Sequence, residues 1–420
     1  MSLETFDAPE ACFTLQKQNW AVRFRDESNR PEDTTYAFYL LRNGVRVAHR
    51  WYEKSSEATF ENDGIAGRYQ VKVFVKQMHM HDGSSTTHTF DSETITQNGR
   101  PYDLRQWNHV PLFERNIADL WGTEEPSNGL YHFKIADHHV DLLLDGMEKV
   151  GTSPAILVCF NGAVSSRSGM SAPFFSGVGI AKQLDVPVLS VADPTLSWSH
   201  EIGLGWYAGH DGLPDLPHYI SQLLDSFAQR TGSRLILFGG SGGGFASLLT
   251  LGLIKSAGAS AFVWNPQTSI SQYNSTFVVC YLKTAFPNHA VSNRLDNALE
   301  SAGIIHDLTT FAPLLKSSHQ VLYIQNKSDW HTRTHASPFL AKFPSRQEKS
   351  EDVILCSENL AYWEGNWGEG HAPPPKPIIV SALRQLLAGK PVATVALALS
   401  EEYAQASRVA TEEDTNTANQ

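Results

Sequence analysis

Alternation of apolar and polar residues is clearest in the first quarter of the chain, in the segment 69–76. Tyr69, Val71, Val73 and Val75 fall on one side of an extended chain, and polar or charged residues fall on the other. A period of two is typical of a β-strand with one buried face. We therefore predict that this segment is a half-buried strand at the edge of a β-sandwich.

Three further segments before residue 92 are rich in β-branched and aromatic residues. Two of them are separated by Asn43-Gly44, a dipeptide that favours a two-residue hairpin turn. The segments are 19–25, 36–42 and 45–52. Together they predict an immunoglobulin-like β-sandwich domain over residues 1–92.

The stretch that follows is marked by histidines and prolines. His79, His81 and His88 could hold a metal, but a polar hairpin loop rich in glycine and serine is the more ordinary interpretation. Residues 93–128 show no sustained periodicity and contain three prolines. We expect a connector there, with one short helix at 112–121.

Strand-like and helix-like segments alternate between residues 129 and 390, which predicts a mostly parallel sheet flanked by helices. One helix is legible from its apolar stripe, because Ile220, Leu223, Leu224 and Phe227 follow helical spacing. Residues 391–420 form a C-terminal extension, and we expect its acidic end to be unordered. The predicted strands are 130–135, 141–144, 155–160, 186–191, 234–238, 261–264, 321–325 and 352–356.

Composition and charge indicate which compartment and which partners to expect. The 420 residues are 41% hydrophobic and 18% charged, and the net charge of −11 would repel nucleic acid and anionic lipid. There is no basic leader and no apolar run of bilayer length, and the 4 cysteines are widely spaced, which favours free thiols in a reducing compartment. We expect a cytoplasmic protein with no membrane span, no nucleic-acid partner and no metal.

Residues 234–249 read as an apolar strand, a Gly-x-Ser-x-Gly turn and a helix, with Ser241 at the centre. Such a nucleophile elbow needs glycines, since strand and helix pack closely on either side of the serine. A phosphate-binding loop would carry a lysine, and this turn has none. Ser241 is therefore the predicted nucleophile.

A serine hydroxyl needs a base that accepts its proton and an acid that orients the base. Asp329 follows the strand 321–325 and comes after the serine in the chain. Asp193 also ends a strand, but it precedes the serine, against the usual order in this kind of site. The predicted acid is Asp329.

Three histidines compete for the role of base. His371 lies between glycines on a loop before the last predicted helix of the domain, and the glycines free the backbone to present its ring. His331 and His335 are close to the acid, but their i, i+4 spacing suggests an exposed pair on a helix. We therefore prefer His371.

Attack on an ester carbonyl forms an oxyanion, which needs two aimed N–H donors. The first is expected from Gly242, the residue after the nucleophile. The second is expected from Gly162 or Ala163, in a turn of small residues after the strand 155–160. The sequence leaves the choice between these two open.

Aromatic and amide side chains gather in the loops after two predicted strands, at the sheet edge where open α/β sheets bind ligands. These side chains could contact a sugar or another polar substrate, although burial within the loops is the ordinary alternative. The candidate substrate-binding residues are Trp198, Trp206, Tyr207, Trp264, Asn265 and Gln267.

The elbow Gly239-Gly-Ser-Gly-Gly243, the loop ending at Asp329 and the pair Gly370-His371 resemble the α/β-hydrolase family. The resemblance covers about residues 130–390. It implies a doubly wound α/β-hydrolase catalytic domain over residues 129–390, with a Ser-Asp-His triad.

Three short motifs, Phe160-Asn-Gly-Ala, Asp193-Pro-Thr and Trp264-Asn-Pro-Gln, are similar to bacterial surface-glycan proteins of this fold. These include capsule O-acetyltransferases and the acetylating accessory-secretion protein. The resemblance implies a serine enzyme that moves an acyl group to or from a saccharide.

No residue pattern decides between hydrolysis and transfer, since both pass through an acyl-serine and differ only in whether water or a sugar hydroxyl attacks it. A transferase would need an acyl donor such as acetyl-CoA, and no other cofactor is expected. The alternative is a protein of the same fold with little or no catalysis, which binds or assembles components of a glycan or secretion pathway. A protein partner at the N-terminal domain would suit that role.

Overall fold

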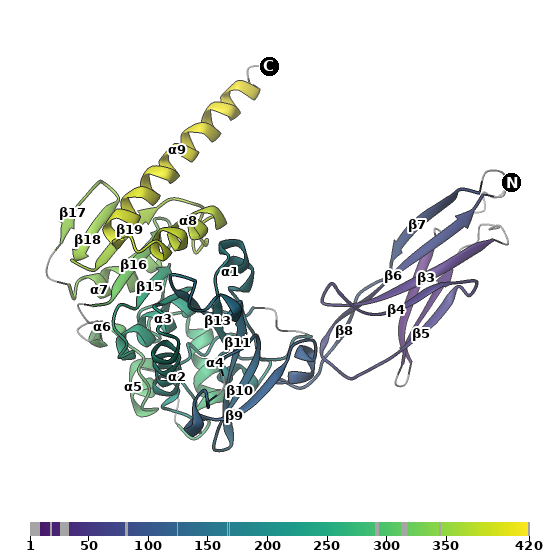
Figure 1. The fold of residues 1–420 in the computed structure, drawn as a ribbon, viewed down its shortest axis with the longest axis horizontal. Helices are drawn as coiled ribbons and strands as arrows, with labels where there is room; N and C mark the ends of the chain where they lie inside the picture. Colours follow the sequence, from purple (N-terminus) through teal and green to yellow (C-terminus); the bar gives the residue numbers. More distant parts are fainter. Residues whose placement is uncertain are drawn as a thin grey trace. The chain divides into compact units, whose positions relative to one another are not determined.

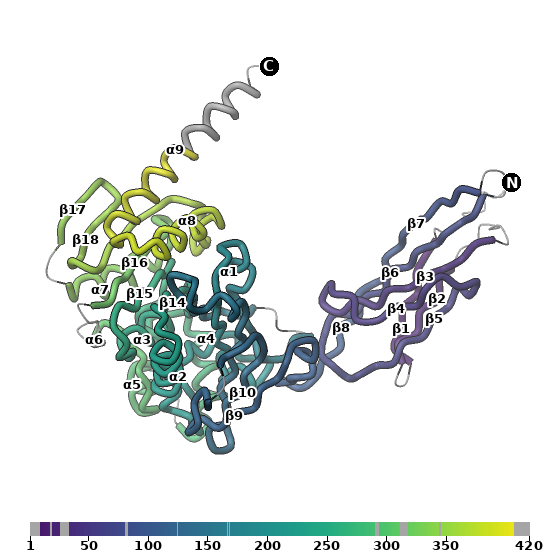
Figure 2. Tube along the Cα trace, in the orientation of Figure 1, coloured from purple at the N-terminus to yellow at the C-terminus, as the bar shows by residue number. Residues whose placement is uncertain are grey.

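The computed structural model describes residues 9–16, 19–25, 33–79, 83–123, 125–165, 167, 169–289, 294–311, 318–343 and 346–418 (Figure 1). The chain divides into two compact units, which Figure 2 traces by residue number. The first comprises Met1–Gln106 with Arg167–Ser171, and the second comprises Trp107–Ser166 with Ala172–Gln420.

The first unit is rich in β-structure. Its strands are β1 (Glu10–Gln16), β2 (Asn19–Arg25), β3 (Thr34–Arg42), β4 (Val45–Glu53), β5 (Glu57–Glu61), β6 (Gly67–Met78), β7 (Ser85–Asp91) and β8 (Ile95–Gln97). One sheet has the order β1-β2-β5 and the other β4-β3-β6-β7, with β8 paired to β6. Both sheets contribute to one apolar core, in which the rings of Trp20 and Tyr69 stack at 4.5 Å.

The alternation in 69–76 is confirmed, because Tyr69, Val71, Val73 and Val75 are all buried in this core. Their strand is not an edge, however, since β6 lies between β3 and β7. The sequence shows which face is buried but not which neighbours pair with it. The immunoglobulin-like label stays a prediction.

The histidine stretch divides between a loop and a strand. His79 hydrogen-bonds to the hydroxyl of Thr86 at 2.6 Å, and His88 belongs to β7. His81 lies outside the described residues.

The second unit is built on one mixed sheet. Its strands are β9 (Leu112–Asn116), β10 (Gly129–Ile135), β11 (His138–Asp145), β12 (Ile156–Phe160), β13 (Val188–Val191), β14 (Leu235–Gly240), β15 (Ser260–Trp264), β16 (Gln320–Asn326), β17 (Gln347–Glu348), β18 (Val353–Ser357) and β19 (Leu360–Gly365). They follow the order β17-β18-β19-β16-β15-β14-β12-β13-β11-β10-β9. The strands from β13 to β19 in this order are parallel, and β11 is antiparallel to both of its neighbours.

Helices cover both faces of this sheet (Figure 1). The α-helices are α1 (Val178–Leu184), α2 (Leu216–Thr231), α3 (Gly242–Leu253), α4 (Ser275–Ala285), α5 (Leu295–Ser301), α6 (Leu308–Phe311), α7 (Ser337–Leu340), α8 (Lys376–Leu387) and α9 (Val392–Ala418). Buried residues of α2 to α5 join one core cluster, and those of α1, α8 and α9 join the other. Residues of β12 alternate between the clusters, as a strand buried on both faces must.

Shorter helical turns lie between these elements: η1 (Leu104–Trp107), η2 (Ile117–Asp119), η3 (Met147–Lys149), η4 (Pro194–Ser197) and the π-helical turn η6 (Thr332–Ala336). No helix in the described ranges has both the length and the apolar character to cross a bilayer.

Two features of this unit differ from the sequence expectation. The predicted helix at 112–121 is β9 followed by η2, because the segment pairs with β10, a contact that local pattern does not reveal. The strand β19 was not predicted at all. The C-terminal extension is assigned to α9 (Val392–Ala418), and the unordered acidic end stays a prediction.

Candidate active site

Ser241 stands at the turn between β14 and α3 with φ 54° and ψ −121°, a conformation that a non-glycine residue rarely adopts. Its neighbours are glycines for a steric reason. A Cβ on Gly239 would lie 2.7 Å from the backbone carbonyl of Gly243, and one on Gly243 would clash with the carbonyl oxygen of Phe160. The tight approach of strand, helix and neighbouring strand therefore holds the serine in its strained conformation.

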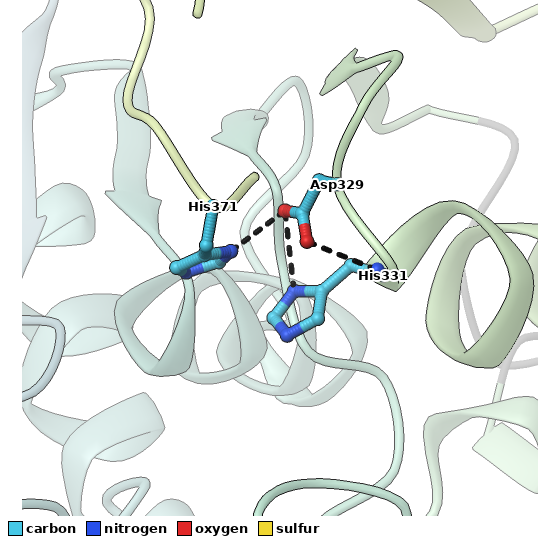
Figure 3. A group of neighbouring side chains, drawn as sticks. All are labelled: Asp329, His331 and His371. Atoms are coloured by element: carbon cyan, nitrogen blue, oxygen red, sulfur yellow. Dashed lines mark hydrogen bonds and ion pairs between the residues drawn. The ribbon is translucent and has the colours of Figure 1, made fainter. Parts of the chain in front are cut away.

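Asp329 follows β16 and His371 follows β19, two strands that lie side by side in the sheet. The Nδ1 atom of His371 lies 2.6 Å from Oδ2 of Asp329 (Figure 3). Burial opposes ionisation of this carboxyl, but hydrogen bonds from the His371 ring and the His331 backbone outweigh it, and the pKa of Asp329 is lowered. The site thus pairs a buried carboxylate with a ring that is 34% exposed.

Amide side chains hold the loop that carries His371. Asn326 donates from Nδ2 to the carbonyls of Gly368 and Gly370 at 2.9 and 2.7 Å. Asn265 donates from Nδ2 to the carbonyl of Ala372 at 2.7 Å. These bonds hold the backbone on both sides of His371, although the loop is rich in glycine.

His331 and His335 are fully buried, so the expectation of an exposed pair was wrong. The Nδ1–H of His331 donates to the carbonyl of Asn265 at 3.0 Å, and Nδ1 of His335 accepts the backbone N–H of Thr268 at 3.3 Å. Burial lowers the pKa of His331 to about 4 and that of His335 to about 3. Both rings are neutral near pH 7.

A cavity of about 380 Å³ brings the predicted groups together. Ser241, His371, Gly162 and Ala163 all line it, together with apolar side chains that include Phe160, Ile180 and Phe238. A Cβ on Gly162 would lie 3.2 Å from the carbonyl oxygen of Gly240 and 3.9 Å from Cβ of Ser241, so this turn approaches the serine closely. Gly242 is the first residue of α3, where backbone N–H groups have no intrahelical acceptor.

The predicted substrate-binding residues separate into three groups. Trp264 and Asn265 line the cavity, but the Asn265 amide is already engaged by protein groups. Trp198 is 40% exposed and packs against the ring of His210 at 4.6 Å, without reaching the cavity wall. The third group is buried: Trp206, Tyr207 and Gln267.

These three buried side chains bond to protein atoms, so we correct the expectation that they face substrate. The Nε1–H of Trp206 donates to Oε1 of Gln267, whose Nε2 donates to Oγ of Ser241 at 3.0 Å. The hydroxyl of Tyr207 accepts the N–H of Asn161 at 2.7 Å and donates to the carbonyl of Val191 at 3.0 Å. Tyr207 thus holds the turn that contains Gly162.

Asp193, which the sequence ranked below Asp329, has a structural role. One of its oxygens accepts the backbone N–H of Tyr207 at 2.9 Å and the other accepts that of Thr195 at 3.0 Å. Burial raises the pKa of this carboxyl. Its bond to Tyr207 stabilises two successive residues with positive φ, Trp206 at 55° and Tyr207 at 56°.

Sequence reasoning missed two residues of the site. Tyr273 lines the cavity, and Asn326 anchors the loop of His371. Asn326 could have been suspected, since it ends the strand before the predicted acid. Tyr273 lies in a loop without any motif, so only the fold brings it here.

One group in the described part of the chain, formed by Asp329, His331 and His371, has potential metal ligands within 4.8 Å of one another. The Nδ1 of His331 carries the proton that it donates to the Asn265 carbonyl, so this atom has no lone pair for a cation. We therefore interpret the group as a hydrogen-bonded cluster.

Comparison with known proteins gives remote structural likenesses. No family model and no curated protein matches the chain. A glycosylation-associated protein complex (Gap123) from Streptococcus agalactiae is 14% identical, with 90% of this chain and 71% of that chain covered and a TM-score of 0.45. The capsule O-acetyltransferase of Neisseria meningitidis serogroup A is 16% identical, with 64% and 99% covered and a TM-score of 0.43.

An S-formylglutathione hydrolase from Agrobacterium tumefaciens is 13% identical, with 64% of this chain and 95% of that chain covered and a TM-score of 0.37. All three likenesses have low sequence identity and a TM-score below 0.5. The case for an activity of this chain therefore rests on the geometry of its own site.

Proposed function

We propose that this chain is a serine enzyme of acyl esters, with Ser241 as nucleophile, His371 as general base and Asp329 as the acid that orients the base. One observation carries the proposal: a serine in a strained turn and a histidine bonded to a buried carboxylate line the same cavity. Strain of this kind persists where the surrounding structure enforces it, which is common at catalytic nucleophiles.

The chemistry follows from these positions. With Nδ1 bonded to Asp329, His371 keeps Nε2 to take the proton as Ser241 Oγ bonds to the ester carbonyl carbon. The backbone N–H groups of Gly242 and of Gly162 or Ala163 stabilise the oxyanion. His371 then gives its proton to the departing alcohol as the ester bond breaks, which leaves an acyl-serine. Water or a sugar hydroxyl attacks this intermediate and completes hydrolysis or transfer.

The cavity wall favours a short acyl group. Phe160, Ile180, Phe238 and Trp264 supply apolar surface, and the total volume of about 380 Å³ is at the lower end for small-molecule sites. A saccharide as the other half of the ester is proposed on the motifs after β12, β13 and β15 alone. The proposed alcohol half of the ester thus rests on these motifs, whereas the proposed acyl half rests on the cavity.

The test uses the purified chain with p-nitrophenyl acetate, first alone and then with oligosaccharide acceptors and acetyl-CoA. Rapid release of nitrophenol that acceptors do not change identifies an esterase, and acetylated sugar identifies a transferase. Ser241→Ala is the matched control and should be inactive in both. A wild type that is inert in every arm contradicts the proposal and favours a protein that only binds or assembles.

A further inference from the structure

The side chain of Gln267 bonds to the nucleophile, and the proposed chemistry does not use it. It is fully buried, and its Nε2 donates to Ser241 Oγ at 3.0 Å. Its backbone N–H also donates to the carbonyl of Ser241, at 3.1 Å. The side chain of Gln267 also forms a hydrogen bond with Tyr273. These contacts hold Gln267 on protein groups and not on a ligand.

The orientation of the Gln267 amide is determined by Trp206. An indole Nε1–H can only donate, so the amide atom that faces it must be the oxygen. The NH₂ group must then face the other way, toward Ser241. Trp206 is itself fully buried and fixed by the neighbouring backbone bond from Tyr207 to Asp193.

A donor at this place decides where the serine proton points. An N–H from Gln267 occupies one lone pair of Ser241 Oγ, so the hydroxyl hydrogen cannot point at the amide and is left to donate elsewhere. The base lining the same cavity is His371. The same N–H also faces the atom that departs with negative charge when the acyl-serine breaks down, and it can stabilise that charge without reorganisation.

We propose that Gln267 is a catalytic residue, which donates to Ser241 Oγ, directs the hydroxyl proton to His371 and stabilises the serine oxygen as it leaves the acyl-enzyme. Trp206 is a positioning residue that acts by fixing the amide. The proposal rests on the proposed function of Ser241 as nucleophile.

The test is Gln267→Glu, because a carboxylate keeps the size of the amide and still accepts the N–H of Trp206. Its second oxygen, however, accepts the hydroxyl of Ser241 and draws the proton away from His371. We expect at least about a 10²-fold loss of kcat/KM at about pH 9, where the carboxyl is ionised.

The pH profile separates this role from a structural one. Burial raises the pKa of a carboxyl, so lowering the pH protonates Glu at this position and restores a donor toward Ser241. The ratio of variant to wild-type activity should therefore rise as the pH falls from about 9 to about 5.5. A variant within about threefold of wild type, or a reduced ratio that does not change with pH, overturns the proposal.

Two further variants keep the result interpretable. Gln385→Glu makes the same chemical change at a buried position of α8 that does not line the cavity, and should leave both activity and profile unchanged. Trp206→Phe removes the N–H that orients the amide and should cost about tenfold. An inert wild type contradicts the proposed function itself, whereas an active, Ser241-dependent wild type with a pH-independent Gln267→Glu defect contradicts only the role of Gln267.

Discussion

Two histidines lie beside the same carboxylate of Asp329 in opposite surroundings (Figure 3). His371 is 34% exposed on a glycine-rich loop, with its Nδ1 2.6 Å from Oδ2. His331 is fully buried, with its Nδ1 3.8 Å from the same oxygen and bonded to the carbonyl of Asn265. Burial lowers the pKa of His331 to about 4, so this ring stays neutral near pH 7.

The difference shows that nearness to an acid does not make a histidine a base. A base must also reach the reacting atoms and be able to carry a proton. His371 lines the cavity with Ser241, whereas the His331 ring points into protein and gives its one N–H to the backbone. We therefore propose catalysis for His371 and structural support for His331.

Replacement of each histidine in turn is the strongest test of this difference between His371 and His331. We expect Ser241→Ala and His371→Ala to lose at least about 10³-fold in kcat/KM, because the nucleophile and its base act as a unit. His331→Gln keeps an N–H for the Asn265 carbonyl and should stay within about tenfold of wild type. Ester hydrolysis rates measure all three, and an inactive His331→Gln beside an active His371→Ala would reverse the assignment.

The shared carboxylate can be neutralised without a change of shape. Asp329→Asn should lose about 10²-fold in kcat/KM, less than His371→Ala, because the ring keeps a neighbour but loses the charge that stabilises its imidazolium. Steady-state kinetics of Asp329→Asn and His371→Ala show which variant loses more kcat/KM. A greater loss for Asp329→Asn than for His371→Ala contradicts the assigned roles.

The buried histidine should appear in the pH dependence of stability. Its folded pKa of about 4 lies below the ordinary 6.5, so between these values the unfolded chain binds the extra proton. Stability is therefore fully present above pH 6.5 and falls as the pH drops toward 4, by roughly 3 kcal/mol for this one group.

Urea unfolding at several pH values measures this effect. His331→Gln should lose less stability than wild type over the same interval. His109→Gln changes an exposed histidine and should follow wild type. If the free energy of unfolding changed equally with pH in His331→Gln and wild type, the result would contradict a buried neutral ring at His331.

The smallest predicted effect concerns the turn that contains Gly162, at the proposed oxyanion site. Tyr207→Phe leaves the N–H of Asn161 without its acceptor and loosens the turn containing Gly162, so kcat/KM should fall about tenfold. KM for p-nitrophenyl acetate should change little, since Tyr207 is buried away from ligand. A change confined to KM would place Tyr207 in substrate binding after all.

Local sequence patterns predicted the elements that depend on residues close together in the chain. The glycines at 239 and 243 indicated the elbow, and the stripe from Ile220 to Phe227 indicated α2, because steric limits and helical spacing are written in neighbouring residues. The pair of Asp329 and His371 was proposed from chain order, and the structure places the two side chains in contact.

What the sequence could not supply depends on distant contacts. His331 and His335 looked exposed because spacing says nothing of burial, and the pairing that makes residues 112–116 a strand comes from β10. Gln267 looked like a ligand-binding amide, yet Trp206, far away in the chain, turns it toward the serine. Each of these outcomes depends on a partner brought in by the fold.

A search for the acyl-enzyme tests the proposed role of Ser241 most directly. Wild type and Ser241→Ala are mixed with p-nitrophenyl acetate, quenched in acid, digested and analysed by mass spectrometry. The proposed mechanism predicts one added acetyl group on the wild-type peptide that contains Ser241 and none on that peptide in Ser241→Ala. Nitrophenol release at the wild-type rate with no acetyl on that peptide, or with acetyl on another residue, would contradict it.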